Sequence, residues 1–72
     1  MTKLDLVLYA IKADFFGYAS NVKEISNNKY EVYVDGDTTV MTKTELEDTW
    51  NSIDNIEKEN IIIEYSKDNG LL

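Results

Sequence analysis

The chain has no cysteine, histidine, proline, arginine or glutamine among its 72 residues. Without cysteine, neither a disulfide bond nor a cysteine-based zinc site can hold the fold together, so packing or self-association must do so. Without histidine as well, the commonest general base and the commonest nucleophile of enzymes are both missing. This bias, with many lysine, asparagine, isoleucine and tyrosine residues, is typical of a low-GC genome, such as that of a Gram-positive bacterium or its phages.

Sequence motifs of catalysis and metal binding are missing too. The four serines lie in no G-x-S-x-G sequence, and the three glycines are too scattered to form a phosphate-binding loop. An EF-hand loop starting at Asp35 would need glycine at its sixth position and glutamate at its twelfth, but Val40 and Leu46 stand there. We therefore expect a protein that is not an enzyme and that uses no cofactor or metal ion.

Length and hydropathy predict one small domain that comprises residues 1–72. A chain of this size buries only about 60% of its unfolded surface, so each apolar residue matters for the core. No stretch approaches the roughly 18 consecutive apolar residues of a membrane span. The start at Met1 lacks the apolar run and cleavage site of a signal peptide. We expect a complete, cytoplasmic protein whose residues 67–72 form a flexible tail.

Apolar residues at helical spacing predict a first helix over residues 4–16. Thr2 is placed as its N-cap, with Asp5 three residues further on, and Gly17 as its C-cap. The aromatic residues at the end of this helix are also compatible with the start of extended structure.

Three strands are expected in the middle of the chain, over residues 21–26, 29–34 and 38–42, and apolar and polar residues alternate cleanly in the second of them. Asn27-Asn28 forms the first turn, since asparagine tolerates positive φ, and Asp35-Gly36 is a strong hairpin signal.

The length of the second hairpin loop decides which side chains face the core. A two-residue loop puts Met41 on the face of Tyr30, whereas a three-residue loop puts Val40 there, since one step of register flips every side chain. We favour the three-residue loop, because it places Val40 opposite Val32.

A second helix and a fourth strand complete the predicted fold. Thr44 and Glu47 form a capping box, and the apolar spacing continues a helix over residues 45–57. The β-branched run at residues 61–65 predicts the last strand. The expected fold is α+β, with the order α-β-β-β-α-β and an antiparallel sheet that carries both helices on one face.

Charge is the most unusual feature of the sequence. Fourteen acidic residues and seven lysines give a net charge of −7. Residues 1–30 contain three acids and four lysines, whereas residues 31–72 contain eleven acids and three lysines, a net charge of −8. Nucleic acids and anionic membranes are unfavourable ligands for such a chain, because both are bound by basic patches.

We expect the acids of the second half to gather on a single exposed side of the domain and to form a docking surface for a basic protein. On a continuous second helix, Glu47 and Asp54 would share one face, with Glu45 and Asp48 beside them. Tyr33 lies on the polar face of the second strand, where it could contact a partner protein. The predicted partner-binding residues are Tyr33, Asp35, Asp37, Glu45, Glu47, Asp48, Asp54, Glu57, Glu59 and Glu64. The alternative is that these acids only improve solubility and, at helix N-termini, complement the helix dipole.

In its length, its charge of −7 and its acid-rich segment from Glu31 to Glu64, the chain resembles the small acidic DNA-mimic inhibitors made by bacteriophages. The resemblance implies carboxylates that imitate the DNA backbone and occupy the basic site of a host DNA-binding protein. The histone-like nucleoid protein HU is the preferred target, with restriction, repair, CRISPR and transcription proteins as other targets. These mimics share no sequence motif, so the resemblance transfers no site residue. The alternative is a small homodimeric interaction domain, formed through residues 61–65 or an exposed sheet edge.

Overall fold

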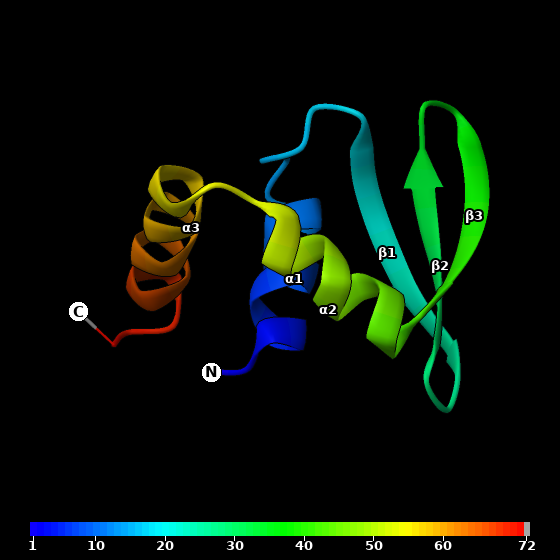
Figure 1. Ribbon diagram of the computed structural model, residues 1–72, viewed down its shortest axis with the longest axis horizontal. Coiled ribbons are helices and arrows are strands. Elements are labelled where there is room, and N and C mark those ends of the chain that lie inside the picture. Colours follow the sequence, from blue (N-terminus) through cyan, green and yellow to red (C-terminus); the bar gives the residue numbers. More distant parts are fainter. Residues whose placement is uncertain (72) are drawn as a thin grey trace.

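Three helices and a three-stranded antiparallel sheet form one α+β domain, in the order α-β-β-β-α-α (Figure 1). The computed structural model describes residues 1–71. The elements are α1 (Lys3–Lys12), β1 (Ala19–Ser26), β2 (Lys29–Val34), β3 (Asp37–Thr42), α2 (Lys43–Ser52) and α3 (Asn55–Asp68). The α+β class and the three antiparallel strands are confirmed, but the predicted final strand is wrong, because its residues belong to α3.

Helix α1 begins as predicted and ends four residues earlier than predicted. The hydroxyl of Thr2 accepts a hydrogen bond from the Asp5 backbone N–H (3.1 Å), and the Asp5 carboxylate accepts one from the Thr2 N–H (3.2 Å). The helix stops at Lys12, because Ala13 is its C-cap and Asp14 takes a positive φ of 62°. Gly17 is therefore not the C-cap, and the aromatic residues before it lie in the connection to β1.

The second hairpin has the two-residue loop, so the preferred three-residue loop was wrong. Val34 pairs with Asp37, and the two residues between them take positive φ values of 49° and 87°. Such turns match the twist of antiparallel strands, and aspartate followed by glycine is well suited to them. Tyr30 consequently pairs with Met41, while Val40 lies on the opposite face and is 54% exposed.

The inner face of the sheet packs against α1 and α2, as predicted for two helices on one face (Figure 1). Val32 of β2 is fully buried, together with Val7 of α1 and Leu46 of α2. Eleven buried hydrophobic residues make the core: Leu6, Val7, Ala10, Ile11, Ala19, Val22, Tyr30, Val32, Leu46, Trp50 and Ile61.

Helix α2 starts with an earlier capping box than the predicted one. Two T-x-x-E sequences overlap here, and the structure uses the first: Thr42 accepts from the Glu45 N–H (3.2 Å), and Glu45 accepts from the Thr42 N–H (3.0 Å). Thr44 therefore lies inside the helix and is not its N-cap. This choice follows from the strand, because Thr42 is the last residue of β3 and has the extended backbone that an N-cap needs.

The predicted helix over residues 45–57 is divided into two helices. Ile53 and Asp54 have extended backbones, and the Asp54 carboxylate accepts a hydrogen bond from the Glu57 N–H (2.9 Å) as the N-cap of α3. Helix α3 then runs through the predicted strand, because Ile61 and Tyr65, four residues apart, both turn towards the core cluster. The β propensity of three consecutive isoleucines is thus overridden by tertiary packing.

Helix α3 forms a separate layer, on the side of α1 away from the sheet (Figure 1). Lys67 and Asp68, expected in the tail, are its last two residues, and residue 72 of that tail lies outside the described residues. The Tyr9 hydroxyl donates a hydrogen bond to Asp68 (2.6 Å) and links α1 to the end of α3. No helix within residues 1–71 is long and apolar enough to cross a membrane.

Candidate protein-binding surfaces

The nine predicted partner-binding carboxylates are accessible and almost uncompensated by lysine. Seven are exposed, and the remaining two, Glu47 and Glu57, are half-buried. In the part of the chain that the structure describes, the only ion pair joins Lys67 to Glu64, with 3.6 Å between Nζ and Oε1. The high negative charge of the second half of the sequence therefore reaches the surface.

Two of these acids also have a structural role. Glu45 caps the start of α2, and Asp54 caps the start of α3. Negative charge near a helix N-terminus is favourable in itself, so the presence of these two residues is explained without a partner. The other seven acids, Asp35, Asp37, Glu47, Asp48, Glu57, Glu59 and Glu64, cap no helix.

The hairpin acids lie far from the start of α2. Asp35 and Asp37 stand at the turn where β3 begins, and α2 starts where β3 ends, beside the Asn27-Asn28 turn. A strand of six residues spans about 20 Å. The two groups of acids therefore occupy opposite ends of the sheet (Figure 1).

The acids of α2 face in different directions. Glu45 and Asp48 are three residues apart and share the outer side of the helix. Glu47, two residues from Glu45, points about 200° away around the helix axis, since each residue turns about 100°. Because α2 ends at Ser52, Glu47 and Asp54 lie on different helices and do not share a face, contrary to the prediction.

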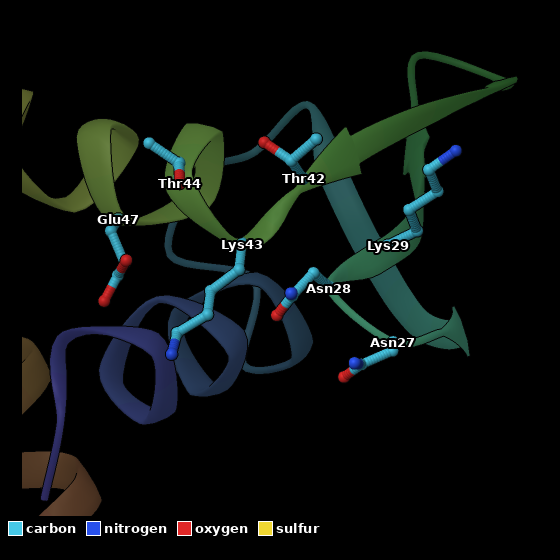
Figure 2. A pocket seen from close by; sticks show the side chains of 7 residues that line it. All are labelled: Asn27, Asn28, Lys29, Thr42, Lys43, Thr44 and Glu47. Carbon is cyan, nitrogen blue, oxygen red and sulfur yellow. The ribbon is translucent and has the colours of Figure 1, made fainter.

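Glu47 lies in an open depression of mixed charge with a volume of about 350 Å³. Figure 2 shows the side chains of Lys43 and Glu47 projecting on the same side of α2, while Lys29 projects away from them. The depression is lined by Asn27, Asn28, Lys29, Thr42, Lys43, Thr44 and Glu47. With two lysines for one carboxylate, this part of the surface does not extend the acidic side of α2.

The acids of α3 also lie on two sides. Glu57 and Glu64 are seven residues apart, which is almost two helical turns, so they share a side. Glu59 is two residues from Glu57 and therefore faces away from it. Ile56, 74% exposed, adds an apolar side chain to the outer surface of this helix.

The carboxylates are thus distributed along the molecule and do not gather on a single side, contrary to the prediction. They extend from the hairpin at one end to α3 at the other, and the longest dimension of the domain is 33 Å (Figure 1). Among residues 1–71, no three acidic side chains lie close enough together to hold a metal ion.

Two tyrosines, outside the predicted set, have perturbed pKa values. The hydrogen bond to Asp68, assisted by partial burial and by nearby carboxylates, raises the pKa of Tyr9 to about 12. Burial raises the pKa of Tyr30, and the neighbouring Glu24 adds to the effect. Both phenols donate hydrogen bonds to carboxylates, so they act as links within the fold.

Tyr33 lies where the sequence placed it, on the outer face of the sheet and 47% exposed. Val40 is a surface residue that the sequence did not predict, because the three-residue hairpin loop that was favoured would place its side chain in the core. Val40 lies on the same open face of the sheet as Tyr33, and α1 and α2 leave this face uncovered.

Comparison with protein-family models, with curated proteins and with solved structures gave no match.

Proposed function

We propose that this protein binds the basic DNA-binding surface of a bacterial host protein and so competes with DNA for it. The observation that carries the proposal is the accessibility of nine carboxylates, seven of them exposed and two half-buried, with a single lysine partner among residues 1–71. Like charges on one small domain repel each other and lower its stability. A cationic partner would relieve this repulsion, and the binding would take place in the bacterial cytoplasm.

The spacing of the charges supports an extended partner surface. Duplex DNA presents phosphates all along its length, and one helical turn is about 34 Å long. The longest dimension of this domain is 33 Å, and acids occur at both of its ends. A groove shaped to hold about one turn of DNA therefore has the length to reach the acids at both ends of the domain. The histone-like protein HU, whose arms and saddle are basic, is the preferred partner.

The competing function is that of an ordinary interaction domain whose acids only maintain solubility. The capping roles of Glu45 and Asp54 favour this alternative for those two positions. A variant at either position would change the stability of the domain as well as its binding, so the two effects could not be separated. The test therefore uses acids that are exposed and form no side-chain hydrogen bond or ion pair within the described residues, namely Asp35, Asp48 and Glu59.

The experiment measures the affinity of the purified chain for purified HU by calorimetry. The variant Asp35→Asn, Asp48→Asn, Glu59→Gln should bind about tenfold more weakly or worse, because three exposed charge contacts are removed. Asp35→Asn alone has a matched control in Asp14→Asn. Both positions are exposed aspartates at positive φ, but Asp14 belongs to the part of the sequence with net charge +1.

The control Asp14→Asn should retain the affinity of the unmodified chain, while Asp35→Asn should lose part of it. Equal affinities for all these variants would contradict the proposal and favour the solubility function. A chain that does not bind HU, and does not bind other basic DNA-binding proteins in the same assay, would reject it as well.

A further inference from the structure

Strand β3 has a free edge. It is the last strand in the sheet order β1-β2-β3, and no other element of residues 1–71 lies along its outer side (Figure 1). Antiparallel pairing directs the backbone N–H and C=O groups of alternate residues to opposite sides. Since Val34 and Asp37 close the two-residue turn, Asp37, Thr39 and Met41 face β2, and the backbone groups of Thr38 and Val40 point outwards.

The two edge strands of the sheet differ in how well they are protected against pairing with a strand of another molecule. Strand β1 has register irregularities near both of its ends and carries Lys23 and Glu24. Strand β3 pairs with β2 without interruption from Asp37 to Thr42, and three consecutive residues of it, Thr38, Thr39 and Val40, are exposed and β-branched. Proteins commonly block unwanted pairing at an edge with a lysine, a proline or a bulge. None of these devices occurs within β3.

The charges at the two ends of β3 are complementary to each other. Asp35 and Asp37 stand at its start, while Lys43 follows its last residue and Lys29 pairs with that residue, Thr42. A strand that approached in the parallel direction from a second copy would put like charges together. An antiparallel approach puts the acidic end of each copy beside the basic end of the other, so β3 is electrostatically matched to itself in one direction only.

We propose that two copies of this chain associate through their β3 edges to form a continuous six-stranded antiparallel sheet. With the two-fold axis at Thr39, Thr38 of each copy pairs with Val40 of the other, and the outward N–H and C=O groups of both residues find partners. The same register brings Asp35 alongside Lys43 of the second copy. Thr42 needs no partner, because its N–H already donates to Glu45. This inference does not depend on the proposed function.

The experiment is sedimentation equilibrium of the full chain over a range of concentrations, at about 0.15 M salt to screen the repulsion between two chains of charge −7. The unmodified chain should shift from the monomer mass to twice that mass. Val40→Pro should weaken this dimer about tenfold or more, since proline removes an outward N–H without touching the β2 ladder. Val40→Thr is the matched control, because it keeps the N–H and the β-branched side chain, and it should dimerise normally.

A second variant, Thr38→Lys, tests the edge without proline and should also weaken the dimer, because the second copy would bury or displace a charge. Circular dichroism of each variant establishes that the monomer is still folded. A chain that stays monomeric up to about 1 mM would overturn the inference. So would a dimer that Val40→Pro and Thr38→Lys leave unchanged, since it would have to use another surface.

Discussion

Helix α1 has a different kind of neighbour on each of its two sides. Towards the sheet and α2, it meets fully buried side chains such as Val32 and Leu46. Towards α3, Ile61 is the one large hydrophobic residue of that helix in the buried core, and the Tyr9–Asp68 hydrogen bond lies at the surface. A layer with few buried contacts opens at a lower free energy than the rest of a domain. We infer that the sheet, α1 and α2 form the stable unit and that α3 is attached to it less firmly.

The largest effect is expected from Leu46→Ala, which creates a cavity on the sheet side of α1. Leu46 is completely buried, so the loss should be about 2–5 kcal/mol of the free energy of unfolding, enough to unfold much of so small a domain. Urea unfolding followed by circular dichroism measures it. A loss below about 1 kcal/mol would contradict the assignment of the core to this side.

Ile61→Ala should cost less, about 2–3 kcal/mol, because α3 can shift to fill part of the cavity. Hydrogen exchange should show lost protection in α3 while the amides of β2 stay protected, as local opening requires. The matched control is Ile63→Ala on the same helix, where the side chain is 42% exposed and the effect should stay within about 0.5 kcal/mol. Equal loss of protection in β2 and α3 would show that the domain opens as one unit.

A smaller effect is expected from Tyr9→Phe, which removes the hydrogen bond between α1 and Asp68. The pKa of Tyr9 in the folded chain, about 12, lies above its ordinary value of 10. The stabilisation is therefore complete below pH 10 and is lost as the pH rises towards 12. The melting temperature of the unmodified chain should fall more steeply than that of Tyr9→Phe in this interval.

Tyr65→Phe provides the control for this pH dependence. Tyr65 contacts the ring of Tyr9 edge-on, with 5.5 Å between ring centroids, but its hydroxyl forms no side-chain hydrogen bond within residues 1–71. Its variant should keep the steep fall of the unmodified chain. If all three chains lose stability in parallel, the Tyr9–Asp68 link does not hold α3 in place.

The smallest effects on stability are expected from neutralising one exposed acid on each side of α1. Asp48→Asn on α2 and Glu59→Gln on α3 should each change the free energy of unfolding by less than about 0.5 kcal/mol. Thermal unfolding of both variants measures this. A large loss at either position would mean that charge contributes to the difference between the two layers, in addition to packing.

Local signals in the sequence predicted the parts of the fold that depend on neighbouring residues. The capping box of Thr2 and Asp5 and the turn at Asn27-Asn28 were correct, because each is decided by hydrogen bonds or backbone conformations within a few residues. The three strands were also predicted, although β1 begins two residues and β3 one residue earlier than predicted. The prediction of a strand over Ile61 to Tyr65 was wrong. β-branched residues favour strands locally, but contact with α1 stabilises a helix here.

The exposure of the acids was predictable, and their arrangement was not. Ionised carboxylates without a partner remain in water, so sequence alone placed them at the surface. Which of them share a side depended on the break after Ser52, where one predicted helix becomes two and separates Glu47 from Asp54. The two-residue hairpin loop likewise turned Val40 outwards and created the exposed edge of β3.

The central claim, that these carboxylates compete with DNA for a basic protein surface, is tested most directly by displacement. A fluorescent duplex is bound to purified HU at low salt, the unlabelled chain is added, and the fraction of free duplex is followed at increasing salt. We expect the chain to release the duplex stoichiometrically, and we expect its affinity for HU to fall steeply as salt rises. A duplex that remains bound at every concentration of the chain, with HU and with other basic DNA-binding proteins in the same assay, would contradict the claim, and so would binding that is indifferent to salt.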